Sequence, residues 1–293
     1  MKKSNRKFLL LILIPCFLEV FIFLVIPIFG TGAISFMDYN PLQVRNEFVW
    51  INNYRRLFTD PDFAIALKNT LVFTFVTVAL NIMTALLLAA MISQLKSNKT
   101  RAFFRMIVFL PCMAPMAASS VVWARSLYPA NGGLFNTIIK AFGGAPIPWL
   151  SDARYLMMSI IIFSIWVDVG YNTILFSAGM DGIPQDLYQA AQLDGAGRWK
   201  LFTKITLPLL GRTTTFITLM TLISHFQMFA QFNILAMRDG PQNSGLVLTS
   251  YIYKTAFVYK QMGYAAAMSM ALFVIILAVS LVQQKAGKVD WEY

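Results

Sequence analysis

Three polar residues, Ser164, Asp168 and Asn172, recur every four positions inside an otherwise apolar run. That spacing places their side chains on one face of a helix, with Tyr171 close by. An ionisable side chain at membrane depth is costly, so it is a functional hypothesis by default. The alternative is that Asp168 lies high enough in the run to meet external water or a cation of a neighbouring helix.

Two further apolar runs carry polar stripes at helical spacing. One stripe comprises Thr70, Thr74, Thr77, Asn81 and Thr84, and the other comprises Thr214, Thr218, Thr221, Ser224, His225, Gln227 and Gln231. Amide side chains in hydrocarbon need partners, so Asn81, Gln227 and Gln231 are candidate contacts for a polar solute. The alternative is close helix packing, with threonine bonding its own backbone. The single histidine, His225, is expected to be a hydrogen-bonded interior residue.

The composition indicates that the surroundings of these stripes are a lipid bilayer. Hydrophobic residues make up 58% of the 293 residues and charged residues only 13%, whereas soluble domains average about 25% charged residues. The charges fall between apolar runs, and a helix needs about 20 mostly apolar residues to cross the hydrocarbon core. We therefore expect an all-α membrane protein with six transmembrane helices, at about residues 8–34, 67–93, 104–126, 155–179, 210–236 and 262–284.

The distribution of basic residues predicts the orientation of these helices. With the N-terminus inside, the cytoplasmic segments hold 14 of the 24 Lys and Arg residues, although the external loops are longer. This bias favours cytoplasmic positions for both termini. The net charge of +11 then reflects topology and predicts no nucleic-acid partner.

We expect the chain to comprise three parts. Residues 1–66 hold the first span and the first external loop, residues 67–284 form a transmembrane core, and residues 285–293 form a cytoplasmic tail. Pro111 and Pro115 each remove a backbone donor, so they predict a kink in the third span.

No motif in the chain provides an energy source or a catalytic centre. The G-x-x-x-x-G-K-[ST] loop that cradles nucleotide phosphates does not occur. No cluster suitable for a metal and no Ser/His/Asp set lies on an obvious soluble domain, so we expect neither an enzyme nor a cofactor bound by this chain. Uphill transport would draw on an ion gradient or on another subunit.

The polar segment between the fourth and fifth apolar runs carries helix start and stop signals. Gly182 ends one helix, Pro184 suits the first position of the next, and Gly195 is a typical stop. We expect a short cytoplasmic helix near 184–195, with one face formed by Leu187, Ala190, Ala191 and Asp194. Small residues there permit close approach by another surface, which indicates a docking element. The alternative is an ordinary amphipathic surface loop.

The sequence of this segment, "IPQDLYQAAQLDGAGRWKLFTKITLPLL", resembles a known family signature. It is similar to the E-A-A…D-G-A…F…I-x-L-P-L-L motif of ABC-transporter permeases, the membrane subunits of binding-protein-dependent importers. The segments "FVWINNYRRLFTDPDFAIALKNTLVFT", "RAFFRMIVFLPCMAPMAASSVVWARSLYPANGGLFN" and "DGPQNSGLVLTSYIYKTAFVYKQMGYAAAMS" extend the resemblance, which is strongest to the maltose-permease-like sugar branch. The chain departs from the pattern at Gln189, where the family has an acid, and at "MRDGP" in an external loop.

The resemblance implies a fold and a mechanism. It implies the type I ABC importer fold, in which the signature helix sits in a cleft of a cytoplasmic ATPase. The ATPase-coupling residues would be Gln189, Ala190, Ala191, Asp194, Gly195 and Ala196. The expected partners are a second homologous permease subunit, two cytoplasmic ABC ATPase subunits that bind ATP and Mg, and an extracytoplasmic solute-binding protein. The expected location is the bacterial cytoplasmic (inner) membrane.

The solute implied by the resemblance is a sugar or an oligosaccharide. The candidate pathway residues are Asp168, Tyr171, Asn172, Gln227, Gln231 and Asn81. An acidic saccharide or glycerol-phosphate is an alternative, because the external loops are net basic. From other classes, an ion-coupled six-span secondary transporter and a non-transporting membrane scaffold remain alternatives.

Overall fold

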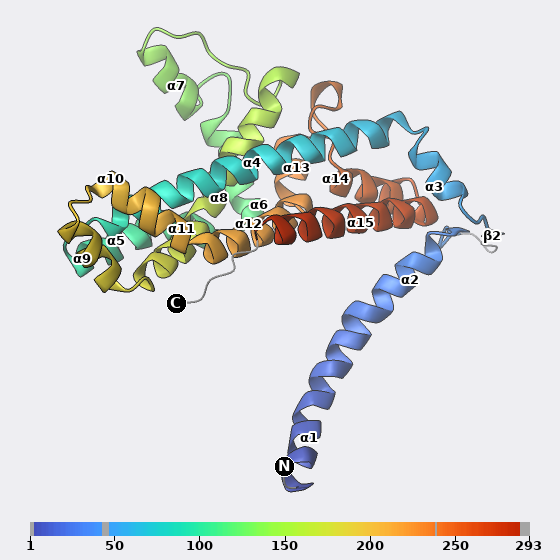
Figure 1. The fold of residues 1–293 in the computed structure, drawn as a ribbon. Coiled ribbons are helices and arrows are strands. Elements are labelled where there is room, and N and C mark those ends of the chain that lie inside the picture. The colour runs from blue at the N-terminus through green and yellow to red at the C-terminus, as the bar shows by residue number, and fades with distance from the viewer. Residues whose placement is uncertain (1–2, 43–46, 238, 288–293) are drawn as a thin grey trace. The chain divides into compact units, whose positions relative to one another are not determined.

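The computed structural model describes residues 3–42, 47–237 and 239–287, most of them in helices. Backbone contacts divide the chain into two compact units. The first comprises residues 1–64 and 251–275, and the second comprises residues 65–250 and 276–293. The division into parts 1–66, 67–284 and 285–293 stays a prediction. Figure 1 shows the elements coloured along the chain.

The first unit begins with one continuous helical segment and a short hairpin. Its described elements are α1 (Lys3–Val20), the π-helix η1 (Phe21–Val25), α2 (Ile26–Ile34), β1 (Met37–Asp38), β2 (Glu47–Phe48) and α3 (Asn52–Leu57). The two strands pair antiparallel, with Met37 opposite Phe48. The π-helix η6 (Lys254–Val258) and the first part of α15 (Met262–Ala286) complete this unit.

Asp60 joins three segments of the first unit. Its Oδ1 accepts hydrogen bonds from the backbone N–H groups of Asp62 and Phe63 at 3.0 and 3.3 Å, which caps the start of α4 (Pro61–Ser93). Its Oδ2 accepts the Tyr251 hydroxyl at 2.7 Å and the Tyr264 hydroxyl at 2.6 Å. Burial opposes ionisation of this carboxyl, but these hydrogen bonds outweigh burial and hold the pKa of Asp60 below its ordinary value.

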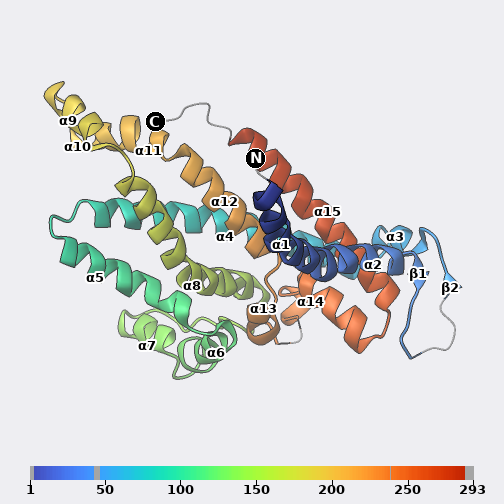
Figure 2. The same cartoon turned by 90° about the horizontal axis from the view of Figure 1, so that it is seen from below.

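The second unit contains the elements that position the candidate site. In chain order they are most of α4, then α5 (Asn98–Phe109), η2 (Leu110–Met113), α6 (Met116–Val122), η3 (Trp123–Leu127), α7 (Leu134–Ala141), α8 (Ala153–Asp181), α9 (Gln185–Leu193), α10 (Arg198–Leu201), η4 (Phe202–Thr206), α11 (Leu207–Leu209), α12 (Gly211–Phe226), α13 (Ala230–Leu235), η5 (Pro241–Asn243), the start of α14 (Leu248–Tyr253) and the end of α15. Figures 1 and 2 both place α9 and α10 beyond the C-terminal end of α8.

Helix α8 is the central packing partner of the second unit, where it contacts α5 and α12. A side chain at Gly170 would collide with the backbone carbonyl of Val108, so the crossing of α8 and α5 requires glycine there. At Gly179 a Cβ would lie 2.9 Å from both Leu210 Cδ2 and Thr213 Oγ1. These two glycines permit close approach of helices, as small residues do in membrane bundles.

The third apolar run is broken rather than continuous. Helix α5 with η2 meets α6 and η3 at a bend of 91°. Pro111 lies in the first turn of η2, and Pro115 precedes α6. Ala114 is extended at ψ 136°, the conformation that a following proline favours. The kink predicted from the prolines is confirmed, and whether the two helices form the one span expected over 104–126 stays a prediction.

The fifth apolar run differs more from its prediction. The segment 198–209 meets α12 at a bend of 64°. Helix α12 then ends at Phe226, and a separate helix, α13, begins at Ala230. The single helix expected over 210–236 is therefore wrong, and Gln227 and Gln231 do not continue the α12 stripe.

The chain is a mostly helical protein with four helices long and apolar enough to cross a membrane among the described residues. They are Leu11–Ile34, Pro61–Ser93, Ala153–Asp181 and Met262–Ala286. The number rises to six if each bent pair is one span.

Candidate functional site

Helix α9 forms between Pro184 and Gly195, as the sequence predicts. Pro184 is the N-cap residue, one position earlier than expected. At the other end Gly195 has φ 76°, a conformation that glycine adopts without steric cost. The N–H of Ala196 donates to the Ala191 carbonyl at 2.9 Å and that of Gly195 to the Gln192 carbonyl at 3.0 Å. This is the Schellman pattern of a helix stop, so Gly195 fixes where the helix ends.

Two contacts anchor α9 to the rest of the second unit. Ile183, just before the helix, is buried in an apolar cluster that includes Phe176 and Leu210. On the helix itself, the hydroxyls of Tyr188 and Thr206 are 2.9 Å apart and hydrogen-bonded. Thr206 ends η4, the segment that leads into α11 and α12. The position of α9 is therefore linked directly to the fifth apolar run.

The predicted coupling positions of α9 are open to solvent. Gln189, Ala190, Asp194 and Gly195 are exposed, and Ala191 and Ala196 are partly exposed. Large apolar side chains on the same segment are also uncovered, with Leu193 90% and Trp199 78% exposed. Exposed apolar side chains gathered on one segment indicate an interaction surface. Leu193 lies on α9 beside the predicted coupling positions, and Trp199 lies on the adjacent α10.

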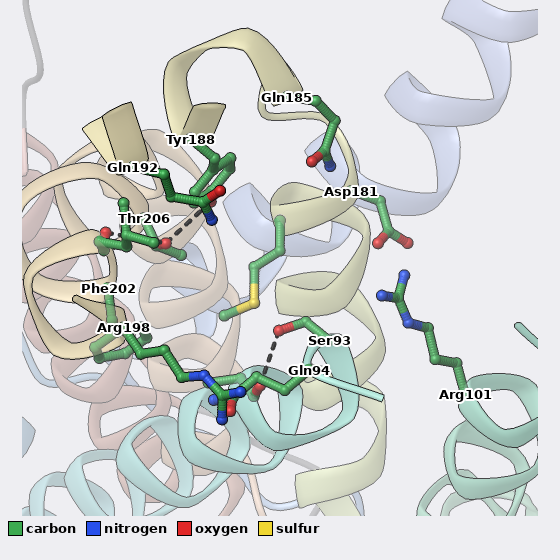
Figure 3. A pocket seen from close by; sticks show the side chains of 13 residues that line it. Ser93, Gln94, Arg101, Asp181, Gln185, Tyr188, Gln192, Arg198, Phe202 and Thr206 are labelled. Atoms are coloured by element: carbon green, nitrogen blue, oxygen red, sulfur yellow. Dashed lines mark hydrogen bonds between the residues drawn. The ribbon is translucent and has the colours of Figure 1, made fainter. Parts of the chain in front are cut away.

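A polar pocket of about 370 Å³ lies behind α9, between it and the ends of α4, α5 and α8. Gln185, Tyr188 and Gln192 line it from one face of α9 (Figure 3). The remaining lining residues are Ala90, Ser93, Gln94, Arg101, Met180, Asp181, Arg198, Leu201, Phe202 and Thr206. None of the six predicted coupling residues lines the pocket, and of the three α9 residues that do, Gln185 and Gln192 are also exposed while Tyr188 is partly buried.

An ion pair holds the end of α8 next to this pocket. Arg105 on α5 contacts Asp181 through an Nη2–Oδ2 distance of 2.8 Å. Both side chains are partly exposed, so the pair contributes little free energy on its own. It fixes the point from which the chain leaves α8 toward α9. Neither residue was a sequence candidate, because the pair joins segments far apart in the chain.

The predicted pathway residues Asn81 and Asn172 lie together inside the helix bundle. Asn172 Nδ2 donates to Asn81 Oδ1 at 2.7 Å and to Thr221 Oγ1 at 3.1 Å. All three side chains are buried, on α4, α8 and α12. The Thr221 hydroxyl donates in turn to the Ile217 carbonyl at 2.7 Å. Asn172 therefore satisfies its amide hydrogens within the protein and connects the three helices.

Asp168, Tyr171 and Asn172 also line a cavity of about 350 Å³ within the bundle. The other lining residues are Phe109, Cys112, Met220, Thr221, Ser224 and His225. The Cys112 thiol donates to the Val167 carbonyl at 2.9 Å. Phe109 ends α5 and Cys112 lies in η2, just before the break in the third run. The polar spacing along the fourth apolar run could not predict that Phe109 and Cys112, from the third run, line the same cavity.

His225 faces Asp168 across the cavity. Its Nε2 lies 3.7 Å from Asp168 Oδ2, which is beyond hydrogen-bond distance. Neither atom has a hydrogen-bond partner among the described residues. The other ring nitrogen, Nδ1, is 2.9 Å from the Thr221 carbonyl, and the side chain is 2% exposed. His225 is thus a buried, hydrogen-bonded residue, as predicted, and it also lines the cavity, although it was not among the predicted pathway residues.

Gln227 and Gln231 lie apart from this cavity. Gln227 is the exposed C-cap residue of α12, and Gln231 is buried on α13. Their placement differs from the single stripe that the helical spacing predicts, because α12 ends before both residues. Their contact with a solute stays a prediction. Among the described residues, no three His, Cys, Asp or Glu side chains gather as metal ligands would.

These features define a helical membrane protein of several spans with an exposed short helix between two of its apolar runs. The chain belongs to the family of binding-protein-dependent transport system inner membrane components, which matches residues 85–286. Members of this family are membrane subunits of ABC transporters, and they are transport components rather than enzymes.

Curated relatives match over nearly the full chain. The chain is 33% identical to a probable ABC transporter permease protein, YurN, of Bacillus subtilis (strain 168), with 100% of both chains covered. It is 33% identical to the arabinooligosaccharides transport system permease protein AraP of the same organism, with 92% of this chain and 85% of that protein covered. It is also 33% identical to the lactose transport system permease protein LacF of Rhizobium radiobacter, with 94% and 92% covered.

Two solved structures have the same fold. One is a bacterial ABC transporter involved in the import of the acidic polysaccharide alginate, with a TM-score of 0.84, 24% identity, and 97% of this chain and 96% of that chain covered. The other is a bacterial alginate ABC transporter in complex with an alginate pentasaccharide-bound periplasmic protein, with a TM-score of 0.83, 24% identity, and 96% and 93% covered. At this identity the likeness describes the fold alone.

Proposed function

We propose that the chain is a transmembrane permease subunit of an ATP-driven importer that translocates a sugar or an oligosaccharide. One observation carries the proposal: α9 is anchored from behind through Tyr188 and Ile183, while its predicted coupling face is exposed. A surface presented in this way is suited to receive force from a docked partner and to pass it to the spans.

The coupling residues in this proposal are Gln189, Ala190, Ala191, Asp194, Gly195 and Ala196. Their role is mechanical, because alanine or glycine at four of the six positions permits close approach by another surface. Gln189 can donate and accept hydrogen bonds but carries no charge. An exposed ion pair at this position would contribute about 0.2–1 kcal/mol, so its loss is compatible with docking.

The energy source in this proposal lies outside the chain. The sequence holds no phosphate-cradling loop, so ATP and Mg would be bound by two cytoplasmic ATPase subunits. The permease itself would need no cofactor. The remaining partners are a second homologous permease and an extracytoplasmic solute-binding protein that delivers the solute. Family membership favours this reading over the ion-coupled secondary transporter and the scaffold.

The orientation belongs to the same proposal. Six spans in the bacterial cytoplasmic (inner) membrane, with each bent pair counted as one span, bring both termini and α9 to the cytoplasm. The basic-residue bias supports this arrangement. The type I importer architecture is supported by the likeness in fold to the alginate importers.

The cavity around Asp168 and His225 is the site where we propose that the solute passes. A sugar hydroxyl both donates and accepts hydrogen bonds. Such a group between Asp168 Oδ2 and His225 Nε2 would satisfy two buried atoms that lack partners among the described residues. Tyr171 supplies an exposed aromatic ring at the same cavity. The names of the relatives, which refer to arabinooligosaccharides and lactose, support a saccharide.

An acidic saccharide is the second candidate, favoured by the basic external loops. The Asp168 carboxylate at the cavity opposes it, because like charges close together raise the free energy of the bound state. We therefore favour a neutral sugar over an acidic saccharide or glycerol-phosphate.

Reconstituted transport tests this function. The chain would be purified with its co-expressed partners, inserted into liposomes, and supplied with the binding protein, radiolabelled oligosaccharide and ATP. We expect uptake that requires ATP on the cytoplasmic side and the binding protein on the other. Uptake driven by an ion gradient without ATP would instead support a secondary transporter.

A further inference from the structure

The polar pocket behind α9 presents two arginines from different helices. Arg101 comes from the first turn of α5, and Arg198 begins α10. Figure 3 shows Arg101 extending toward Asp181 and Arg198 extending toward Gln94. Arg101 Nε donates to the Leu95 carbonyl at 2.7 Å, which orients the side chain and leaves its terminal nitrogens available.

The pocket carries a net positive charge. Its single carboxylate, Asp181, is already paired with Arg105 at 2.8 Å. Among the described residues, no carboxylate lies within 4.0 Å of Arg101 or Arg198 in an ion pair. Amides of Gln94, Gln185 and Gln192 add hydrogen-bond donors to the lining. A planar guanidinium forms two parallel hydrogen bonds to a phosphate or a carboxylate, so the pocket is suited to an oxyanion.

Exposed aromatic residues flank both arginines. Phe103 and Phe104 follow Arg101 by one turn or less and are exposed, and Trp199 adjoins Arg198 and is more exposed still. Aromatic rings next to basic residues at the ends of spans are typical of the membrane–water interface. This combination favours a membrane lipid over a soluble ligand, because basic pockets between helices on the cytoplasmic side bind anionic headgroups.

The coupling face of α9 does not compete for this pocket. Gln185, Tyr188 and Gln192 face the pocket, whereas the six coupling residues do not line it. An ATPase docked on the outer face would therefore leave the pocket lining available. This separation favours a lipid over an acidic side chain of the ATPase.

We propose that the pocket behind α9 binds the phosphate group of an anionic membrane lipid, with Arg101 and Arg198 as its cationic contacts. Bound phosphate would connect α5, α10 and the inner face of α9. The lipid would thereby stabilise the position of the coupling helix. The cytoplasmic placement of the pocket rests on the proposed function, but lipid binding itself requires no ATPase.

Native mass spectrometry of the purified full-length chain tests this inference. The chain would be mixed with phosphatidylglycerol or with zwitterionic phosphatidylcholine, and the retained lipids counted. We expect retention of phosphatidylglycerol in preference to phosphatidylcholine. The double variant Arg101→Gln/Arg198→Gln should weaken phosphatidylglycerol binding roughly 10- to 30-fold, the effect of two basic residues near a headgroup.

The matched control is Lys99→Gln/Lys200→Gln, which removes the same charge from α5 and α10. Both lysines are exposed and neither lines the pocket. The control should retain phosphatidylglycerol as the wild type does. Equal losses in the two double variants would show general surface attraction and would overturn the proposal.

Inorganic phosphate distinguishes a lipid from a soluble anion. If phosphate alone binds with the same arginine dependence while phosphatidylglycerol does not, the lipid assignment is wrong. If the arginine variant releases the ATPase and leaves phosphatidylglycerol binding unchanged, the occupant is a protein side chain. Arginine-dependent lipid binding in a chain that recruits no ATPase would contradict the proposed function and support this inference.

Discussion

The Tyr188 hydroxyl lies 2.9 Å from the Thr206 hydroxyl, and this hydrogen bond joins α9 to the segment that enters the fifth apolar run. The exposed face of α9 lies on one side of the helix and this bond on the other. A force applied to the exposed face would reach α11 and α12 through Tyr188. The Tyr188–Thr206 hydrogen bond links α9 to the segment before α12, and the Arg105–Asp181 ion pair joins the end of α8 to α5.

The Tyr188 link predicts loss of coupling without loss of assembly. We expect Tyr188→Phe to remove a hydrogen bond of about 0.5–1.5 kcal/mol and to lower uptake per ATP hydrolysed. Thr206→Val should have the same effect, and the double variant should be no worse than either single one. Thr203→Val is the control, because the Thr203 hydroxyl bonds only the Trp199 carbonyl of its own helix among the described residues. Additive losses at Tyr188 and Thr206 would contradict a shared bond.

The conformation of Gly195 predicts that a branched residue there distorts the end of α9. A β-branched side chain at φ 76° is strained by about 1–2 kcal/mol. We expect Gly195→Val to insert into the membrane but to uncouple ATP hydrolysis from uptake. Gly197→Ala is the control, since Gly197 has φ −74° and open space around it. Normal uptake by Gly195→Val would refute the coupling role of this turn.

Close packing at Gly170 predicts a stability effect separate from coupling. A methyl group there meets the Val108 carbonyl, so Gly170→Ala should force α5 and α8 apart. We expect a loss of about 1–3 kcal/mol, seen as a lower midpoint of thermal unfolding in detergent. Gly182→Ala should change the midpoint little, because a Cβ there meets its nearest atom at an ordinary 3.5 Å.

The cavity predicts that Asp168 acts through its hydrogen-bonding oxygens. We expect Asp168→Leu to reduce uptake at least about tenfold, the cost of leaving one polar group of a bound solute unpaired. Asp168→Asn should keep part of the activity, because an amide retains one acceptor. Purification yield of the assembled complex is the measure of folding. Equal uptake by wild type and Asp168→Leu would mean that the solute passes elsewhere.

Gln231 offers a second test of the pathway. The side chain is buried on α13 and does not line the Asp168 cavity. If Gln231 contacts the solute, Gln231→Leu should reduce uptake more than assembly. If Gln231→Leu leaves transport unchanged, this glutamine only packs, and the sequence-based pathway assignment fails at that position.

The Asp60 cluster predicts a pH-dependent contribution to stability. The pKa of Asp60 is lowered from its ordinary value of 3.8, so the ionised form is favoured by folding. The contribution of the ionised Asp60 carboxyl to the free energy of unfolding is complete above pH 3.8. It is lost as the pH falls through the lower pKa of the folded state. We expect the thermal midpoints of wild type and Asp60→Asn to differ near neutral pH and to converge in acid. A difference that grows on acidification would contradict this sign.

Local signals in the sequence predict α9 and fail for the fifth apolar run. Pro184 and Gly195 determine the limits of α9 through backbone geometry, which is a property of those residues themselves. Between Phe226 and Ala230 no glycine or proline occurs, yet α12 ends there. The sequence therefore holds no glycine or proline signal for this helix end. A prediction from helical periodicity alone therefore extended the polar stripe beyond the end of α12, to Gln227 and Gln231.

Polar contacts between distant segments also cannot be predicted from the residue spacing within one helix. The spacing of Asp168 and Asn172 indicates a shared face, but not that Asn81 and Thr221 would bond Asn172. Likewise, prolines predict a break near Pro111 and Pro115 but not its angle of 91°. The presence of Arg101 and Arg198 in the lining of one pocket depends on how α5 and α10 are placed, which no local pattern encodes.

Photo-crosslinking from α9 tests whether this helix docks on an ATPase. A photoreactive amino acid would replace Ala190 on the exposed face, or Gln185 on the pocket face, in the chain expressed in native membranes. We expect an adduct between position 190 and a cytoplasmic P-loop ATPase, identified by mass spectrometry, with little or none from position 185. No ATPase adduct at position 190, or equal adducts from both positions, would contradict the assignment of α9 as the coupling helix.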